Sequence, residues 1–363
     1  MNEPKTIVSR NDLQDVIERV FTACRVPTED ARQAAEVLIT SDLRGIDSHG
    51  VARLRAYVEM LNASLINPDP NIRIERERAS TATIDGDNGL GLVVGPKANN
   101  IAMEKAEKVG SGWVAVNNTN HFGIAGYYPL QALERNQIGW AMTNTGKWMA
   151  PVWGAERMLG TNPIAIAFPG LEEPPVVIDL ATSAVSFGKV QIKMREGKPL
   201  PDGWILDKNG LPSNDPQELI SGGTLLPLGS AYETGGYKGY ALASMVDILT
   251  AVLSGANWGP FAPPFASRVF IPEKSVGKGI GHFFGAMDID GFMEVDEFKK
   301  RIDEWVQTFR KTKAAIGTEG PIIPGDPERH AWDDRILHGI PLLEAVVDDL
   351  HWVAEQTGVD KLA

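Results

Sequence analysis

Four short apolar runs in the middle of the chain constrain its fold more than any other feature. Starting at residues 112, 138, 163 and 174, they read GWVAVNNTNHFG, IGWAMTNT, PIAIAFPG and PPVVIDLAT. Their length and their Gly and Pro boundaries are typical of buried β-strands. Residues 67–91 combine Pro and Asn clusters with an alternating pattern and predict further strands. The middle of the chain therefore predicts a β-sheet.

Helical patterns flank and interrupt this sheet region. Leu13, Val16, Ile17, Val20 and Phe21 have the spacing of an amphipathic helix, which Asn11 would cap. The same reasoning predicts further helices over 28–45, 49–63, 95–110, 235–259, 294–313 and 339–358. The helix over 235–259 is mostly apolar, so we expect it to be buried.

Together these patterns predict an α/β (α+β-like) fold class with a mixed sheet. We expect a helical domain built from both chain ends, residues 1–75 plus 296–363, packed on an α/β domain of residues 76–295. The sequence shows no internal repeat and no low-complexity tract.

The charge balance restricts the partners. A formal net charge of -12 disfavours polyanions, so neither nucleic acid nor an anionic membrane surface is an expected partner. A small anionic substrate stays possible, because a local group of Arg or Lys can override the net field. The single cysteine, Cys24, excludes an internal disulfide framework, and the sequence has no signal peptide or membrane-spanning run. We therefore expect a cytoplasmic protein.

The first candidate site lies in SDLRGIDSHGVARL, residues 41–54. If Ser48 caps the next helix, His49 and Arg53 project from one face four residues apart. An arginine can hold a carboxylate through two hydrogen bonds, and an imidazole can exchange a proton with a neighbouring hydroxyl group. Spacing alone favours the ordinary alternative, a helix boundary with a hydrogen-bonded histidine and a solvated arginine.

A second candidate is His121, which follows a predicted buried strand within NNTNHFGIAGYY. Strand ends often carry functional side chains. A histidine that only satisfies its own loop is at least as good an interpretation. No histidine pair has the spacing of a zinc site such as HExxH, and we expect no metal site.

Two motifs that resemble ligand loops fail on spacing. Gly89, Gly91 and Gly95 give GxGxxxG instead of the dinucleotide fingerprint GxGxxG, so we predict a flexible turn and no Rossmann site. The segment AMDIDGFMEVDE resembles a calcium loop but has Ala286 where the first carboxylate is required.

Two further segments have the composition of anion sites. A predicted strand delivers Asp179, Thr182, Ser183 and Lys189 into a turn rich in small residues, and GGYKGY places Lys238 among glycines at a helix start. Hydroxyl groups and exposed amides at such places suit phosphate. Plain turn chemistry explains both segments equally well.

Six segments in order resemble the malate/L-lactate dehydrogenase family of NAD(P)-dependent oxidoreductases over nearly the whole chain. They are RGIDSHGVARL, NHFGIAGYY, LGTNPIAIAFP, IDLATSAVSFGK, LLPLGSAYETGGYKGYALASMVDILTAVLSGA and IPGDPERHAWDDRILHGIPL. The chain departs from the family pattern at Leu180, at Phe187 and at Asp326, where a glutamate is usual. These departures affect cofactor details more than the reaction.

The resemblance implies a non-Rossmann nicotinamide-binding fold and a homodimer. It implies that His49 of the SHG motif is the proton donor and acceptor, with His121 as second candidate, Ser48 beside it and Arg53 as the carboxylate clamp. The residues it implies for binding NAD or NADP are Thr145, Ile178, Asp179, Leu180, Ala181, Thr182, Ser183, Tyr237, Lys238, Gly325 and Asp326.

The expected substrate is a small 2-hydroxy acid or its 2-oxo acid. Malate is the first choice, because Arg44, Arg55 and Lys147 are additional cations for a second carboxylate. L-Lactate, ureidoglycolate and sulfolactate fit the same chemistry, and the sequence does not separate NAD from NADP. A non-catalytic protein that binds small acids is the alternative from another class, and the presence of both histidines argues against it.

Overall fold

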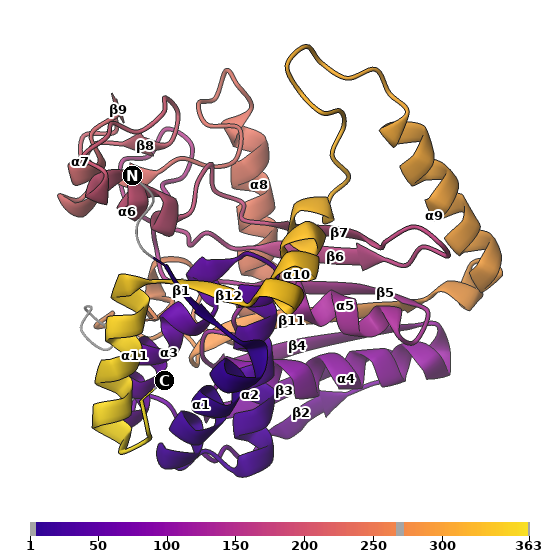
Figure 1. Cartoon of the computed structure of the whole chain (residues 1–363), viewed down its shortest axis with the longest axis horizontal. Helices are drawn as coiled ribbons and strands as arrows, with labels where there is room; N and C mark the ends of the chain where they lie inside the picture. Colours follow the sequence, from indigo (N-terminus) through magenta and orange to yellow (C-terminus); the bar gives the residue numbers. More distant parts are fainter. Residues whose placement is uncertain (1–4, 266–271, 362–363) are drawn as a thin grey trace.

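The computed structural model describes residues 5–265 and 272–361, and a mixed sheet of seven strands lies at its centre (Figure 1). The strands, in spatial order, are β2 (Arg73–Glu77), β3 (Thr81–Gly89), β4 (Ser111–Thr119), β11 (Ile280–Asp288), β5 (Gln137–Thr143), β6 (Ile164–Phe168) and β7 (Val176–Leu180). In this sheet β3 and β4 run parallel, and all other neighbours are antiparallel. The order is not that of a doubly wound parallel sheet. The predicted mixed sheet is confirmed.

The central strand, β11, is absent from the sequence prediction. It pairs with β4 on one side and with β5 on the other. Glycines interrupt its apolar run IGHFFGAMD, and this weakens the strand signal. A Cβ atom at Gly285 would lie 2.4 Å from the Trp113 ring, so tertiary packing requires the glycine that obscures the pattern.

Helices cover both faces of the sheet. On one face lie α4 (Gly91–Val109) and α5 (Tyr127–Leu133), while α8 (Gly236–Asp247) and the π-helical turn Ile248–Val252 contact the other. The flexible turn predicted at Gly89–Gly95 is wrong, because α4 begins at Gly91. A Cβ atom there would lie 2.2 Å from the carbonyl oxygen of Asn120. The glycine therefore allows two backbones to approach closely.

The helical part of the molecule lies at one end of the sheet (Figure 1). It contains α1 (Arg10–Ala23), α2 (Thr28–Leu43), α3 (Leu54–Asn62) and α11 (Glu344–Thr357), with the short antiparallel pair β1 (Lys5–Val8) and β12 (Ile340–Leu343). The predicted apolar stripe of α1 is buried, but its cap is Ser9, whose hydroxyl oxygen accepts the N–H of Asp12 at 3.1 Å. Asn11 lies inside the helix.

The remaining helices and strands extend this core. α9 (Val295–Arg310) lies at the opposite edge of the sheet, where its Val306 packs with Val176 of β7, and α10 (Asp326–His338) lies beside α2 (Figure 1). A small lobe between β7 and α8 contains α6 (Phe187–Arg195), β8 (Ile205–Leu206), β9 (Pro212–Ser213), α7 (Pro216–Ile220) and β10 (Thr224–Leu225). The division of the chain into two domains stays a prediction.

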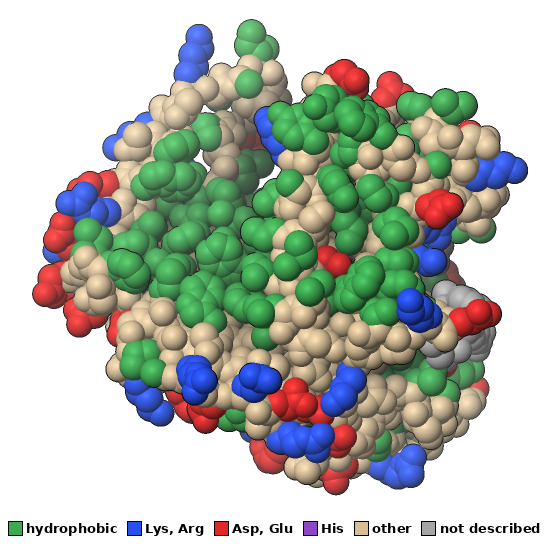
Figure 2. All heavy atoms as spheres, turned by 180° about the vertical axis from the view of Figure 1, so that it is seen from behind, with side chains coloured by type: hydrophobic (Ala, Val, Ile, Leu, Met, Phe, Trp, Pro, Cys, Tyr) green, Lys and Arg blue, Asp and Glu red, His purple; other side chains and the backbone are tan. Residues whose placement is uncertain are grey.

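The expected burial of the helix over 235–259 is wrong in part. One face of α8 packs on the sheet through Val246, but Ile248, Val252 and Leu253 are 55%, 54% and 59% exposed. Figure 2, which shows the molecule from behind relative to Figure 1, shows a broad, hollowed hydrophobic area on this face. No helix in the described ranges is long and apolar enough to cross a bilayer.

Candidate active site

The loop between α2 and α3 is the first part of the site, and Ser48 does not cap a helix there. Asp47–His49 and Val51–Arg53 are two 3-10 turns separated by Gly50, and α3 begins only at Leu54. A Ser48 cap would have bound the N–H of Val51. That N–H instead donates to the buried Asp42 carboxyl group at 2.8 Å, so the Ser48 hydroxyl is free to contact His49 Nδ1 at 2.9 Å.

The fold brings the two candidate histidines together. The rings of His49 and His121 are stacked, with centroids 5.6 Å apart and planes 21° apart. Tyr57 Oη lies 2.6 Å from His121 Nδ1, and the Gly123 N–H donates to the same nitrogen at 3.3 Å. Phe265 stacks on His121 at 4.4 Å. With donors directed at Nδ1, the neutral His121 ring carries its hydrogen on Nε2.

Sequence reasoning missed Tyr57 and Phe265. Tyr57 follows Arg53 by four residues on the same helical face, and this spacing could have revealed it. Phe265 reaches the site from a distant loop, so no local signal identifies it.

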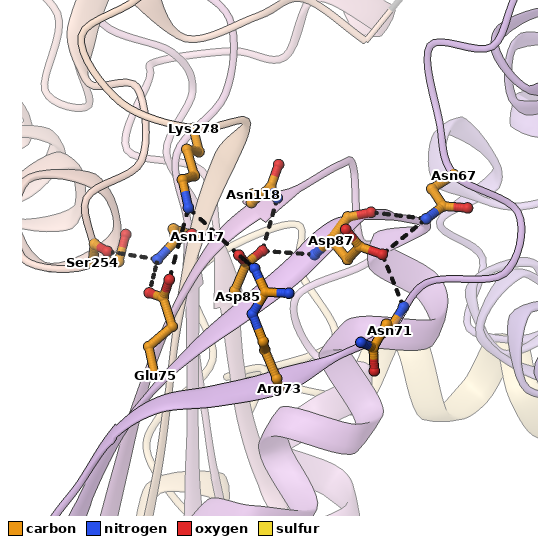
Figure 3. Close-up of polar contacts among 10 residues, drawn as sticks. All are labelled: Asn67, Asn71, Arg73, Glu75, Asp85, Asp87, Asn117, Asn118, Ser254 and Lys278. Atoms are coloured by element: carbon orange, nitrogen blue, oxygen red, sulfur yellow. Dashed lines mark hydrogen bonds and ion pairs between the residues drawn. The ribbon is translucent and has the colours of Figure 1, made fainter.

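A polar network fixes the strand end that leads to His121 (Figure 3). The buried carboxylate of Asp85 accepts from Asn118 Nδ2 at 2.7 Å, from Arg73 Nη2 at 2.7 Å and from the Asp87 N–H at 2.8 Å. Burial favours the neutral acid, but these donors and Lys278 outweigh it and hold the pKa of Asp85 below its usual range. The network ties β3 to the end of β4, two residues before the Asn120–His121 loop.

His282 supports the same loop from beneath. It is fully buried, its Nε2 lies 3.1 Å from the carbonyl oxygen of Asn120, and Phe122 stacks on its ring at 4.7 Å. Burial lowers the pKa of His282 to about 3 although it donates to backbone oxygens. We conclude that His282 is a neutral structural histidine. Its sequence context gave no sign of these contacts.

Both candidate histidines are neutral at pH 7. Burial and the nearby Arg53 cation lower the pKa of His49 to about 4. Burial, His49, Arg53 and His282 lower the pKa of His121 well below 6.5. A neutral imidazole can accept a proton, so this electrostatic setting suits a general base.

Arg53 supplies the positive charge of the site. Its Nε donates to the carbonyl oxygen of Ser48 at 2.6 Å, which directs the guanidinium group along the loop that carries His49. Within residues 5–265 and 272–361 no carboxylate forms an ion pair with Arg53. Burial lowers its pKa, as expected when a cation has lost water without gaining an anion. The two Nη atoms can therefore bind an anionic ligand.

The end of β7 lies next to the loop that follows His121. The Asp179 carboxyl group accepts the N–H of Gly126 at 2.8 Å. Burial raises the pKa of Asp179 to about 6, which the Gly126 N–H and Arg44 oppose. Among the residues expected to bind cofactor, Ile178, Asp179 and Leu180 belong to β7, and Ala181 follows directly. Roles for these residues stay predictions.

Three expected cofactor groups are already engaged within the chain. The hydroxyl group of the buried Thr182 donates to the carbonyl oxygens of Thr161 and Asn162, and that of Ser183 donates to Val185. The Asp326 carboxylate accepts from Arg310 Nη2 at 3.0 Å and from the Ile323 N–H at 3.2 Å. These contacts engage the two hydroxyl hydrogens and the carboxylate within the chain, and the cofactor roles of the three residues stay predictions.

The other expected cofactor residues lie around this segment. Thr145 Oγ1 accepts the N–H of Thr161, and Gly325 is the N-cap of α10, where a Cβ atom would lie 3.1 Å from Val177. Tyr237 and Lys238 are exposed in the first turn of α8, whose N-terminus has no side-chain cap. None of the described contacts joins Tyr237 or Lys238 to the histidine pair.

The additional cations behave differently from one another. Arg55 is engaged by Asp349 at 2.6 Å and lies over the Trp352 ring, so the expectation that it receives substrate is wrong. Lys147 is exposed on a loop. Arg44 is buried near Asp179 and Glu328, and its Nε has no hydrogen-bond partner among the described residues. Arg44 is the remaining candidate.

Metal-binding side chains do not cluster in the described ranges, where no group of three His, Cys, Asp or Glu residues could hold an ion. At the rejected calcium motif, the Asp288 side chain accepts the N–H of Asp290 and caps a 3-10 turn.

Comparisons with known proteins agree on one family. Residues 8–351 match the family model described as malate/L-lactate dehydrogenase. A malate dehydrogenase of Pyrococcus horikoshii is 40% identical over 98% of this chain and 96% of its own. An L-sulfolactate dehydrogenase of Methanocaldococcus jannaschii is 41% identical over 90% of this chain and 88% of its own. The crystal structure of a malate dehydrogenase from Entamoeba histolytica matches with a TM-score of 0.91 at 33% identity, covering 98% of this chain and 99% of that one.

Proposed function

The chain belongs to the malate/L-lactate dehydrogenase family, and on this premise we propose that it interconverts a small 2-hydroxy acid and its 2-oxo acid with NAD or NADP. The enzyme class follows from the family. The choice of substrate, the residue roles and the coenzyme are our proposals.

The observation that carries the proposal is Arg53, which has no carboxylate partner among residues 5–265 and 272–361, beside two neutral histidines. A partly buried guanidinium group without a carboxylate partner is unfavourable by itself, and an anionic ligand removes the penalty. The planar carboxylate of a 2-hydroxy acid matches the fork of Arg53. Such binding places the adjacent C2 hydroxyl group near the histidine pair, because Arg53 and His49 lie on one loop held by the bond to Ser48.

His49 is our choice for the residue that moves the proton. Its Nδ1 contacts the Ser48 hydroxyl oxygen, and when Nδ1–H donates to it, Nε2 carries a lone pair directed away from that bond. In oxidation Nε2 accepts the C2 hydroxyl proton, and in reduction the imidazolium returns the proton to the oxygen. Ser48 orients the ring.

His121 has a complementary role. Tyr57 and Gly123 direct their hydrogens at Nδ1, so Nε2–H is left to donate to the substrate oxygen. Such a donor polarises a carbonyl group without changing its own protonation. Phe265 and His49 both stack on the His121 ring, and this restricts its orientation.

The coenzyme supplies hydride transfer at C2 when it is bound. The N-terminus of α8 suits its phosphate groups, because the positive end of the helix dipole and the exposed Lys238 side chain lie together there. Thr182, Ser183 and Asp326 fit less well, since their side chains are engaged. We propose that the segment after β7 and the start of α10 contribute to coenzyme binding through their backbone.

Malate remains the first-choice substrate. Its second carboxylate needs a further cation, and we favour the buried Arg44, whose Nε has no hydrogen-bond partner among the described residues. Relatives named for malate and for sulfolactate have nearly equal identity to this chain, so identity does not select between the two acids. L-Lactate and ureidoglycolate are the other candidates.

A substrate and coenzyme panel tests this proposal. We expect the protein to reduce oxaloacetate with NADH or NADPH faster than it reduces pyruvate or sulfopyruvate. The loss of coenzyme absorbance at 340 nm follows each reaction. The readout is kcat/KM for each pair. A fastest rate with sulfopyruvate would move the assignment to sulfolactate. No turnover on any 2-oxo acid would overturn the proposed reaction.

We also propose a homodimer formed through the exposed face of α8 and of the π-helical turn Ile248–Val252 that follows it. Leu242, Met245, Ile248 and Val252 recur every three or four residues, so they form one apolar stripe opposite the buried side of the helix. Exposed apolar stripes of this kind mark protein interfaces. Because the resemblance implied a homodimer, we propose a second copy of the chain as the occupant.

Charge in this stripe is expected to separate the subunits. Ile248→Glu combined with Val252→Glu buries two carboxylates at the proposed interface, so the mass by light scattering should fall from twice the chain's 39.4 kDa to 39.4 kDa. Ile220→Glu, at an exposed apolar residue on α7, is the matched control and should stay dimeric. A parent protein that elutes as a monomer contradicts the proposal.

A further inference from the structure

The loop that carries His49 and Arg53 is held by two residues outside it. Asp42, in the last turn of α2, is 1% exposed and accepts the Val51 N–H at 2.8 Å. Arg335, in α10, donates to the Asp42 carbonyl oxygen and forms an ion pair with Asp47. We call the Asp42–Val51 hydrogen bond the inner contact of the loop. The bonds from Arg335, which lies almost 300 residues later in the chain, are the outer contact.

The inner contact leaves little freedom at the turn. The Asp42 carboxyl group occupies the space beside Gly50, where a Cβ atom would lie 2.0 Å from Asp42 Oδ1. Gly50 separates the 3-10 turn that ends with His49 from the one that ends with Arg53. The relative position of these two residues therefore depends on the Asp42–Val51 hydrogen bond.

The outer contact restrains the start of the same loop. Arg335 binds Asp47 through both Nη atoms, and its side chain is 13% exposed. α10 also packs closely against the loop, because Ala331 Cβ would lie 3.0 Å from a Cβ atom at Gly45.

We propose that Asp42 and Arg335 are positioning residues for the proposed reaction, which set the relative placement of the His49 imidazole and the Arg53 guanidinium group. The inference rests on the proposed function. Neither residue touches substrate; both act through the backbone of residues 42–51.

The charge of Asp42 is not what holds the loop. Burial raises its pKa to about 8, although the Val51 N–H and Arg335 oppose this shift, so the group is mostly protonated at pH 7. An asparagine has a similar shape and keeps an oxygen that accepts the Val51 N–H. Asp42→Asn is therefore the conservative variant, and Asp42→Leu is the variant that removes the acceptor.

We expect Asp42→Leu to lower kcat/KM about 10- to 100-fold, because small displacements of catalytic groups have effects of this size. Asp42→Asn should stay within about threefold of the parent, since the hydrogen bond is kept. Binding of NADH, followed by its fluorescence, should be unchanged in both variants. Equal losses in Asp42→Asn and Asp42→Leu, or near-parent activity in Asp42→Leu, would overturn the proposal.

Arg335 gives a second test that does not depend on the folding of the Asp42 variants. Arg335→Met should lower kcat/KM about tenfold, and Arg335→Lys should recover part of it. Arg301→Met, which breaks a pair with Glu297 on α9 at 2.8 Å, is the control and should behave like the parent. Parent-like activity in Arg335→Met contradicts the role of Arg335.

Hydrogen exchange separates failure of this inference from failure of the proposed function. The Val51 amide should exchange at least about tenfold faster in Asp42→Leu than in Asp42→Asn, whatever reaction the protein catalyses. Equal exchange rates overturn the positioning role. A faster rate together with an inactive parent in the substrate panel overturns only the proposed reaction.

Discussion

Replacing His49 with alanine is expected to lower kcat by about 100- to 10,000-fold, the usual range for the loss of a general acid/base. The reason is that no other group in the described ranges contacts Ser48 and carries a free imidazole nitrogen beside Arg53. KM should change much less, because Arg53 still binds the carboxylate. Steady-state kinetics on the best substrate of the panel give both constants.

His121→Ala is the comparison that decides between the two histidines. It removes a hydrogen-bond donor and should lower kcat less than His49→Ala does. If His121→Ala is inactive while His49→Ala is near normal, the roles of the two residues must be exchanged.

The pH dependence of the parent gives an independent test. The pKa of His49 lies near 4, below the ordinary 6.5, so the neutral base persists as pH falls through 6.5. In the oxidation direction kcat/KM should therefore stay flat from pH 8 to about 6 and fall only in more acidic solution. A decline centred at 6.5 would mean that the catalytic histidine is solvated.

Replacing Arg53 with alanine is expected to raise KM for the acid about 100-fold or more. Two hydrogen bonds to a charged group contribute roughly 1.5 kcal/mol or more each, and about 1.4 kcal/mol corresponds to a factor of ten. The affinity for NADH should not change. The measurement is KM for substrate beside the dissociation constant for NADH.

Arg53→Lys keeps the charge and loses the planar fork, so it should recover only part of the affinity. Loss of kcat without a change in KM in Arg53→Ala would show that Arg53 holds the Ser48 backbone and does not bind substrate. The hydrogen bond from Arg53 Nε to the Ser48 carbonyl oxygen is the contact through which such a structural role would act.

The sequence predicted the fold class well where the pattern is local. The apolar runs that become β4, β5, β6 and β7 are bounded by Gly, Pro and Asn, and the stripe of α1 is periodic. β11 was missed, because Gly285 is required by the Trp113 ring on the neighbouring strand and Gly281 by the Thr250 carbonyl oxygen, and neither contact can be read from a local window. α8 was expected to be buried, because hydropathy does not distinguish a side chain in the core from an apolar side chain on the surface.

The candidate site was predicted in part. The sequence identified His49, His121 and Arg53, and the structure brings the two histidines together. It considered Ser48 as a helix cap, because the competing acceptor of the Val51 N–H, Asp42, lies earlier in the chain and is directed inward only by the fold. It also proposed the Thr182 and Ser183 hydroxyl groups for phosphate, and the structure shows that Thr182 donates to the distant Thr161 and Ser183 to the nearby Val185.

The close approach of Asp42 to Gly50 has a consequence for transferring this loop to another scaffold. The segment from Ser48 to Arg53 is not a portable unit, because its shape depends on a carboxyl group eight residues before the glycine. A graft that carries SHGVAR alone would leave the Val51 amide unbonded and the space beside the glycine empty. The smallest transferable piece begins at Asp42 and needs a helix that supplies an arginine in place of Arg335.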